Sequence, residues 1–196
     1  MAETAASPAI TPLFTQDEIA ARVEALAREI AASFPQDFVI IAVLKGSFIF
    51  AADLIRALHR QGLKPEIDFI FLASYGAGTV SGGEVKILRD VETDLAGREV
   101  LIVDDILDSG RTLAFAKTLL EERGARSVRT CVLLDKDVPR AVAISPDFCG
   151  FHCPPVYVVG YGTDLAHRYR ELPFIGALPA RAISELSESR GDSRIG

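Results

Sequence analysis

Three carboxylates, Asp104, Asp105 and Asp108, stand between a run of four apolar residues and the start of a predicted helix. Asp104 and Asp105 can accept hydrogen bonds from two vicinal ribose hydroxyls, and they can interact with Mg²⁺ through its waters. Asp108 lies nearer the helix and is left free for proton transfer. Helix capping alone would account for Asp108, but not for an acidic pair directly after an apolar run.

The residues after these carboxylates favour an anion. Ser109, Gly110, Arg111 and Thr112 open the predicted helix, whose first backbone N–H groups and dipole attract negative charge. Gly110 allows the backbone to approach a bound group closely, and two hydroxyls lie beside it. The segment therefore predicts a site for a ribose that carries a 5-phosphate.

The segment VLIVDDILDSGRTL, residues 100–113, resembles the phosphoribosyl-diphosphate signature of type I phosphoribosyltransferases. It is neither a Walker A motif nor a dinucleotide fingerprint, because neither spacing occurs in the chain. The resemblance implies that Asp104 and Asp105 hold the ribose hydroxyls and Mg²⁺, and that Asp108 is the general base on the N7 side of a purine. It also implies that residues 109–112 bind the 5-phosphate.

A second candidate segment is the turn Leu44-Lys45-Gly46-Ser47, which follows a predicted buried strand. Taken alone, it is either an ordinary strand-to-helix turn or a diphosphate site formed by N–H groups and the lysine. A similar turn binds pyrophosphate in the purine-salvage branch of the family. The resemblance therefore implies that Lys45 and Gly46 bind the diphosphate, and that the Leu44–Lys45 peptide bond is cis.

Lys136 follows another predicted strand, in the sequence LLDKDVPR. An exposed lysine is usually only solvated. In hypoxanthine-guanine phosphoribosyltransferases, however, a lysine in a similar context contacts the 6-oxo group of the base, and the match includes Pro139 and Arg140. The resemblance implies the same contact for Lys136.

The segment YVVGYGTD begins with Tyr157, which is either a core aromatic or a flat surface for a purine to stack on. Similar family segments provide that stack, a backbone contact from the next residue and a metal-binding carboxylate. The resemblance thus assigns these roles to Tyr157, Val158 and Asp164, and it assigns a diphosphate contact to Arg170. The family often has phenylalanine at the position of Tyr157.

Two further segments are open to more than one interpretation. Ser74 and Tyr75 begin a glycine-rich stretch that is either an inert insertion or a lid that excludes water, and the Ser-Tyr pair resembles the family's lid. We therefore expect a mobile lid loop over 74–89. Cys149 and Cys153 flank His152, but this spacing is not a common structural zinc site, so we expect no metal there.

The predicted elements must bring these residues together. Apolar runs and helical periodicity predict helices over 15–32, 48–61 and 112–123, and strands over 38–44, 67–73, 99–103, 127–134 and 156–160, with a short return strand over 84–89. Thr15 and Glu18 have the capping-box spacing at the start of the first helix. The alternation predicts an α/β fold with a parallel twisted sheet flanked by helices. Lys45, Ser74, Asp104 and Lys136 should then gather at the edge where the strands end.

Length and composition limit the possible classes. A chain of 196 residues with 49% apolar content fits a single domain, residues 1–196, with a small hood from residues near 1–36 and 145–196. The net charge of −6 argues against non-specific binding to nucleic acid or an anionic membrane. The chain starts without a secretory signal, and its three cysteines imply no disulfide framework, so we expect a cytoplasmic protein.

The group that the chain resembles most is the bacterial-type hypoxanthine (hypoxanthine-guanine) phosphoribosyltransferases. This resemblance implies transfer of a 5-phosphoribosyl group from 5-phospho-α-D-ribosyl 1-diphosphate to hypoxanthine and guanine, with Mg²⁺ as cofactor and a homodimer or homotetramer as the assembly. Three alternatives stay open: an RNA-binding regulator on the same fold, a transferase for xanthine or another base, and a generic α/β fold without a ligand.

Overall fold

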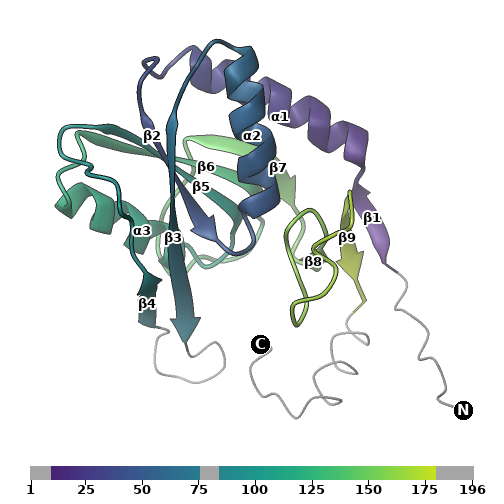
Figure 1. The fold of residues 1–196 in the computed structure, drawn as a ribbon. Coiled ribbons are helices and arrows are strands. Elements are labelled where there is room, and N and C mark those ends of the chain that lie inside the picture. Colours follow the sequence, from purple (N-terminus) through teal and green to yellow (C-terminus); the bar gives the residue numbers. More distant parts are fainter. Residues whose placement is uncertain (1–9, 76–83, 180–196) are drawn as a thin grey trace, which may run out of the picture.

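The computed structural model describes residues 10–75 and 84–179 (Figure 1). Within these ranges the helices are α1 (Gln16–Ala31), α2 (Phe48–Arg60) and α3 (Arg111–Glu122). The strands are β1 (Thr11–Phe14), β2 (Val39–Leu44), β3 (Glu66–Tyr75), β4 (Glu84–Arg89), β5 (Glu99–Leu107), β6 (Ser127–Lys136), β7 (Phe148–Cys153), β8 (Tyr157–Val159) and β9 (Ile175–Leu178).

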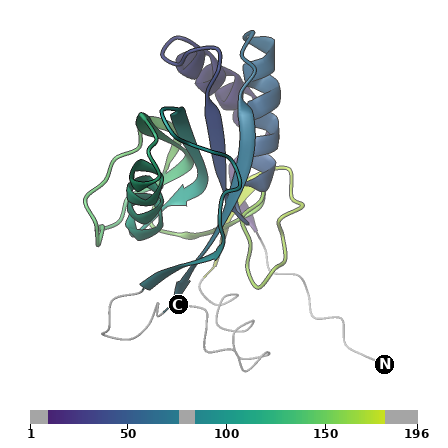
Figure 2. The ribbon, with the colours of Figure 1, turned by 60° about the vertical axis from the view of Figure 1, so that its left-hand side comes forward.

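The large sheet has the strand order β4-β3-β2-β5-β6-β7. Strands β3, β2, β5, β6 and β7 are parallel, and β4 runs antiparallel to β3 at one edge. Figure 2 shows α1 and α2 on one face of this sheet and α3 on the other. The predicted α/β fold is therefore confirmed, with one antiparallel edge strand added.

The apolar run that forms β2 shows why the strands are hydrophobic on both faces. Phe38, Ile40 and Ala42 pack toward α1 and α2, whereas Val39 and Ile41 alternate with them and pack toward α3. A parallel strand covered on both sides must bury every side chain, so it lacks the polar alternation of a half-exposed strand. This burial fixes the position of the turn that follows β2.

Helix α1 begins as predicted. The Thr15 side chain accepts a hydrogen bond from the Glu18 N–H, and the Glu18 carboxylate accepts one from the Thr15 N–H, which completes the capping box. The predicted apolar stripe is buried, at Ile19, Val23, Leu26 and Ile30. Helix α1 therefore packs its stripe against the sheet and α2.

The ends of β5 and β6 differ from the prediction. Both strands continue beyond their apolar runs, because Ile106 pairs with Leu134 and Leu107 pairs with Asp135 in the parallel ladder. Asp104 and Asp105 consequently lie within β5 rather than in a loop, and Lys136 is the last residue of β6. Backbone pairing, which side-chain polarity does not reveal, extends the strands into the site.

The predicted fifth parallel strand over 156–160 is wrong. That segment forms β8, which pairs antiparallel with β9 in a separate sheet of order β1-β9-β8. The fifth parallel strand is β7, which pairs with β6. Strand β7 is a sheet edge whose residues are mostly only partly buried, and Gly150 and His152 interrupt its apolar residues, so no continuous apolar run marks it.

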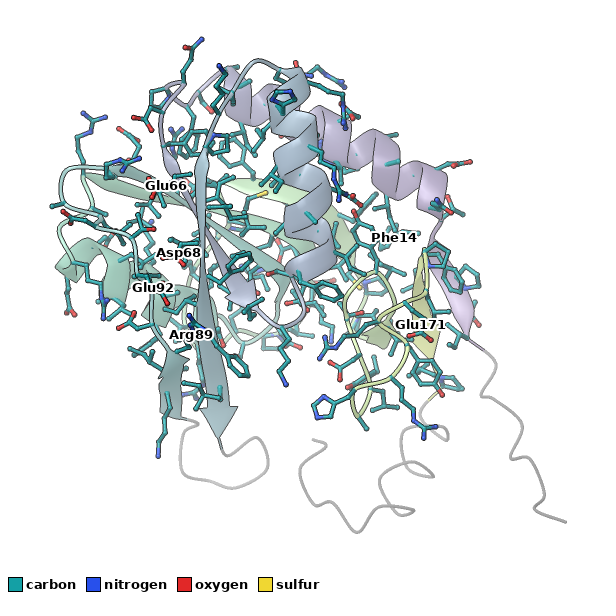
Figure 3. All side chains as sticks on the ribbon, in the orientation of Figure 1. Phe14, Glu66, Asp68, Arg89, Glu92 and Glu171 are labelled. Carbon is teal, nitrogen blue, oxygen red and sulfur yellow. The ribbon has the colours of Figure 1, made fainter. Side chains whose placement is uncertain are left out.

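The small sheet is joined to the large one by aromatic packing. Phe14 of β1 stacks on Phe151 of β7 with ring centroids 4.3 Å apart, and Figure 3 shows where Phe14 lies between the sheets. The predicted hood ranges contain this sheet, but they also contain α1 and β7, which belong to the large-sheet layer. In Figure 1 the small sheet lies toward the end of the molecule at which β2 and β3 end.

The described part of the predicted lid is a β-hairpin. Ser74 and Tyr75 are the last residues of β3, where they pair with Val85 and Glu84 of β4. Residues 76–83, on which the predicted mobility rests, lie outside the described residues, as do the side chains of Ser74 and Tyr75. None of the described helices is both long and apolar enough to cross a lipid bilayer.

At the other end of the hairpin, the connection from β4 to β5 is anchored by one carboxylate. Asp68 of β3 accepts hydrogen bonds from the N–H groups of Glu92 and Thr93, at 2.7 and 2.9 Å. Glu66 and Asp68 lie on the same strand, close to Glu92 (Figure 3). These backbone hydrogen bonds lower the pKa of Asp68 against the opposing effect of its partial burial.

Candidate active site

The turn after β2 carries the first group of candidate residues. The Leu44–Lys45 peptide bond is cis, as the resemblance predicted. Ser47 is buried and its hydroxyl donates a hydrogen bond to the Val43 carbonyl at 2.6 Å, which closes the turn. Lys45 is exposed, with its ammonium 5.3 Å from the centroid of the Phe71 ring. The side chain of Ser47 thus holds the turn, and that of Lys45 reaches toward β3 at the surface.

Gly46 brings this turn into contact with the acidic end of β5. A Cβ atom at position 46 would lie 1.7 Å from Oδ2 of Asp105. No larger residue fits unless Asp105 moves, so the glycine is required by close packing rather than by an unusual φ. The contact joins two segments that the sequence separates by almost sixty residues.

The two carboxylates of β5 lie beside one another, with Asp104 buried and Asp105 partly buried. Asp104 is 5% exposed, and one of its oxygens accepts a hydrogen bond from the Asp105 N–H at 3.0 Å. Burial and the neighbouring Asp105 raise the pKa of Asp104 well above its usual range. Burial also raises the pKa of Asp105, against the opposing effects of hydrogen bonds and the positive charge of Arg170. Such a pair favours hydroxyl donors or a hard cation as its ligand.

Asp108 and Lys136 meet at the ends of β5 and β6. The Lys136 ammonium lies 3.2 Å from a carboxylate oxygen of Asp108, with the lysine side chain 13% exposed and the aspartate side chain 55% exposed. Asp108 is the residue predicted to transfer a proton, and Lys136 is the residue predicted to contact the 6-oxo group of the base. The parallel pairing of the two strands places both functional groups at one point.

The N-terminus of α3 carries the residues that are predicted to bind the 5-phosphate. Gly110 has a φ of 79°, and a Cβ atom there would lie 2.5 Å from the Val142 carbonyl oxygen. The Ser109 carbonyl accepts hydrogen bonds from the N–H groups of Ala141 and Val142 at 3.0 and 3.2 Å. The Arg111 N–H donates to the Ser109 hydroxyl at 3.4 Å. The loop after β6 therefore packs directly on the predicted phosphate segment.

The connection from β8 to β9, residues 160–174, supplies the remaining candidates. The Tyr157 hydroxyl donates to the Asp164 carbonyl at 3.1 Å, and the Asp164 carboxylate accepts from the His167 N–H at 2.6 Å. Arg170 pairs with the other oxygen of Asp164 at 2.7 Å and also donates to the Gly162 carbonyl. Asp164 and Arg170 are thus one bonded unit.

This connection packs on the turn after β2. A Cβ atom at Gly162 would lie 2.2 Å from the Gly46 carbonyl oxygen, so the two glycines allow the segments to touch. Burial of the Tyr157 ring, with the nearby Asp164, raises the pKa of the Tyr157 hydroxyl. Val158 is buried, and its backbone pairs with that of Ala177 in β9.

The same connection is conformationally strained. Four of its residues other than glycine have φ in the left-handed region, namely Tyr161 (48°), Ala166 (52°), His167 (68°) and Tyr169 (73°). Such conformations persist only where the surroundings enforce them, and they cluster at functional sites. Tyr161 is held by a hydrogen bond from its hydroxyl to Asp53 of α2, at 2.7 Å. Sequence analysis missed both residues of this bond, because nothing local in either segment indicates the other.

The three predicted metal-binding carboxylates are not grouped at one point. Among the described residues, the ligand oxygens of Asp104, Asp105 and Asp164 do not converge into one three-residue cluster. The positive charge of Arg170, the partner of Asp164, does reach Asp105 and lowers its pKa. The arrangement therefore offers an acidic pair on β5 and a separate carboxylate on the β8–β9 connection.

The family model of the phosphoribosyl transferase domain matches residues 11–166. The chain belongs to the phosphoribosyltransferase family, as its fold and acidic strand end had indicated. Within that family it is similar to the hypoxanthine-guanine phosphoribosyltransferase of Bacillus subtilis. The two are 44% identical over 167 residues, which cover 85% of this chain and 91% of the relative.

A solved structure described as the hypoxanthine phosphoribosyl transferase of Trypanosoma cruzi is similar to this chain, with a TM-score of 0.86 and 36% sequence identity. The alignment covers 95% of this chain and 100% of the other. A longer relative from Listeria innocua, named bifunctional protein TilS/HprT, is 44% identical over 174 residues. This chain spans only about a quarter (26%) of the length of that relative.

Proposed function

We propose that this protein transfers the 5-phosphoribosyl group of 5-phospho-α-D-ribosyl 1-diphosphate to N9 of hypoxanthine and guanine, with release of pyrophosphate. The observation that carries the proposal is the 3.2 Å contact between Lys136 and Asp108. It places a cation suited to a 6-oxo group beside a carboxylate suited to accept a proton from N7. The names of the full-length relatives support the same reaction.

The ribose is proposed to bind at the end of β5. Asp104 and Asp105 accept hydrogen bonds from its two vicinal hydroxyls, which satisfies carboxylates that are costly to bury unpaired. The pairing of β5 with β6 and the close approach of Gly46 to Asp105 keep the carboxylates in place as the C1–diphosphate bond breaks. The positive charge that develops on the ribose is thereby held near two acids.

The purine is proposed to lie between Lys136, Asp108 and Tyr157. The Lys136 ammonium donates to the 6-oxo group, the ring stacks on Tyr157, and the Val158 backbone contacts the base. Asp108 accepts the N7 proton while N9 attacks C1 of the ribose, so the proton leaves the base as the new bond forms. General-base assistance of this kind contributes about 10²–10⁴ in rate.

The two phosphate groups are assigned to separate turns. Ser109, Gly110, Arg111 and Thr112 receive the 5-phosphate at the N-terminus of α3, where the helix dipole favours an anion. Lys45, Gly46 and Arg170 receive the diphosphate. Ser74 and Tyr75, at the end of β3, belong to a lid over residues 74–89 that closes over it and excludes water.

Mg²⁺ is the proposed cofactor, because the available donors are hard carboxylate oxygens and the buried acidic pair is destabilised by its own charge. Asp104 and Asp105 would hold one ion through ribose and water, and Asp164 would hold another. When bound, the metal neutralises charge on the leaving diphosphate.

We propose a cytoplasmic setting for the enzyme from the state of its cysteines. The three cysteines are all free thiols, which suits the reducing cytoplasm. We assign the hood to the small sheet and its β8–β9 connection, and we expect a homodimer or homotetramer that binds neither nucleic acid nor membranes. One solved relative is described by the effect of its C-terminal region on oligomeric state.

Initial rates of pyrophosphate release with hypoxanthine, guanine, xanthine and adenine test the proposal. We expect turnover with hypoxanthine and guanine, and none with adenine, which lacks the 6-oxo group. A preference for xanthine would revise the substrate. Binding of phosphoribosyl diphosphate or RNA without pyrophosphate release would favour a non-catalytic regulator and contradict the proposed activity.

A further inference from the structure

A second cluster of ligand-type side chains lies on the outer strands of the large sheet. Asp135 of β6 and the pair Cys149 and His152 of β7 each offer a metal-ligating atom, and these atoms all lie within 4.8 Å of one another. Nδ1 of His152 is 3.7 Å from Oδ2 of Asp135. None of the three residues takes part in the proposed transfer reaction, so the cluster is a separate feature.

We propose that Asp135, Cys149 and His152 form a binding site for zinc or a similar divalent transition metal. Tetrahedral zinc with bonds of about 2.0–2.2 Å to nitrogen and oxygen separates those two ligand atoms by about 3.4 Å. The measured 3.7 Å between Nδ1 and Oδ2 therefore needs to close by only a few tenths of an ångström. The mixture of thiolate, imidazole and carboxylate suits zinc and excludes Mg²⁺, which prefers oxygen ligands.

The backbone that carries the ligands is held firmly. Asp135 and His152 are direct partners in the parallel pairing of β6 and β7. Arg22 of α1 donates to the carbonyl oxygens of Cys149 and Gly150 at 2.6 and 2.9 Å, which fixes the outer edge of β7. A site on two paired strands loses little conformational entropy when it binds an ion.

The nearby positive charges are already paired. Arg140 bonds to the Oδ1 atom of Asp135 and to the Ile144 carbonyl, which leaves Oδ2 facing the imidazole. The Lys136 ammonium is engaged with Asp108. The carboxylate oxygen that faces His152 can therefore bind a cation without first losing its partner.

The cluster also has room for an exogenous ligand. The His152 side chain is 86% exposed. A cavity of about 490 Å³ is lined by Asp135, Lys136, Asp137, Val138, Arg140 and His152. Three protein ligands and an open fourth position are the arrangement of a zinc site that keeps water or an external ligand.

Cys153, the other cysteine that flanks His152 in the sequence, is not part of this cluster. The thiol of Cys153 is buried and donates to the Pro154 carbonyl, whereas Asp135 reaches the site from the neighbouring strand. The expectation of no metal concerned Cys149, His152 and Cys153 in one segment. The ligand set that the fold assembles is a different one.

Isothermal titration of the chelator-treated full-length protein with Zn²⁺, in excess Mg²⁺ to occupy the acidic pair, tests the site. We expect one bound Zn²⁺ per chain, and Co²⁺ should give a thiolate-to-metal charge-transfer band. Cys149→Ser should abolish the band, and His152→Ala should weaken Zn²⁺ binding by about tenfold or more. Cys153→Ser and His59→Ala are matched controls that should bind as the wild type does.

The outcomes separate this site from the proposed active site. The inference would be overturned if the wild type bound no Zn²⁺, or if Cys149→Ser and His152→Ala both bound Zn²⁺ as tightly as the wild type does. If circular dichroism shows that Cys149→Ser does not fold, the inference is judged by the Co²⁺ charge-transfer band of the wild type and by the Zn²⁺ affinity of His152→Ala. Because the readout is metal binding, it does not depend on whether the chain transfers a phosphoribosyl group.

Discussion

The acidic end of β5 and the β8–β9 connection both face the candidate active site, but they are held in place by different means. Strand β5 pairs with β2 as far as Val103 and with β6 as far as Leu107, so its acidic end is held by β6 and by the close approach of Gly46 to Asp105. The β8–β9 connection carries four left-handed residues and depends on a few side-chain hydrogen bonds, such as that from Tyr161 to Asp53.

This difference suggests a division of labour. In the proposed reaction, the carboxylates that must stay fixed during bond breaking lie on β5, whereas Arg170, one of the residues proposed to bind the leaving diphosphate, lies on the connection. Substitutions at the strand end should therefore change turnover, whereas substitutions in the connection should change substrate affinity or stability.

Asp108→Asn should have the largest effect. The amide cannot accept the N7 proton, so kcat should fall by about 10²–10⁴ while the KM values change little. Steady-state kinetics with hypoxanthine measure both parameters. Wild-type turnover in this variant would remove Asp108 from the mechanism.

Gly46→Ala tests the contact between the turn and the strand end. The added Cβ would lie 1.7 Å from Oδ2 of Asp105, so one of the two must move. A displacement of that size should lower kcat/KM by about 10²-fold. Gly62→Ala is the control, because a Cβ there has nothing within 4 Å. The Gly62→Ala variant should have a lower free energy of unfolding, because alanine disfavours the φ of 85° at this position, and its activity should be unchanged. Equal activities of Gly46→Ala and Gly62→Ala would argue against the contact.

Arg170→Met tests the connection. Loss of the guanidinium that pairs with Asp164 should raise the KM for phosphoribosyl diphosphate by about tenfold, the equivalent of one charge-assisted hydrogen bond. The value of kcat should change much less. Arg168→Met, at an exposed position two residues away, should behave as the wild type does. A fall in kcat with an unchanged KM would contradict the division of labour.

Asp104→Asn should raise stability while it lowers activity. The native pKa of Asp104 is raised above its ordinary value of 3.8, so the native state binds the proton more tightly than the unfolded state does. The free energy of unfolding of the wild type therefore falls as the pH rises from the ordinary pKa of 3.8 through the raised native pKa of Asp104. At pH 7, without ligand or Mg²⁺, the amide should be more stable by about 1 kcal/mol, and near pH 4 the gain should shrink. Urea unfolding at both pH values checks this; a less stable variant at pH 7 would refute it.

Tyr161→Phe should have the smallest effect. It removes the 2.7 Å hydrogen bond to Asp53, a carboxylate that also pairs with Arg56. We expect a loss of about 1 kcal/mol in the free energy of unfolding and a nearly unchanged kcat. A large fall in kcat with unchanged stability would show that this tyrosine acts in the reaction rather than in holding the connection.

Much of the large sheet could be predicted because each of its central strands is a continuous apolar run. The run that forms β2 predicts a strand covered on both faces, and parallel order then places Lys45, Asp104 and Lys136 at one edge. Strand β7 could not be predicted in the same way, since a half-exposed edge strand has no such run. The short β8 was assigned to the wrong sheet, because apolar residues alone do not reveal a strand's partner.

The site could be predicted only as far as its separate segments. The signature on β5 indicated Asp104 and Asp105 as candidate ribose-binding acids, and the lysine context indicated Lys136 as a candidate for base recognition. The contact of Gly46 with Asp105 and the bond of Tyr161 to Asp53 depend on long-range packing. The approach of Asp135 to His152 depends on the register of two strands. No local pattern in the sequence encodes these pairings.

The kinetics of Lys136→Met test the central claim most directly. If Lys136 recognises the 6-oxo group, kcat/KM for hypoxanthine should fall by about 10²-fold or more, because the buried oxygen loses its donor. The Kd for phosphoribosyl diphosphate, measured by titration calorimetry, should stay the same. Unchanged kinetics with hypoxanthine, or an equal loss of phosphoribosyl diphosphate binding, would contradict the assignment of this end of the sheet to 6-oxopurine transfer.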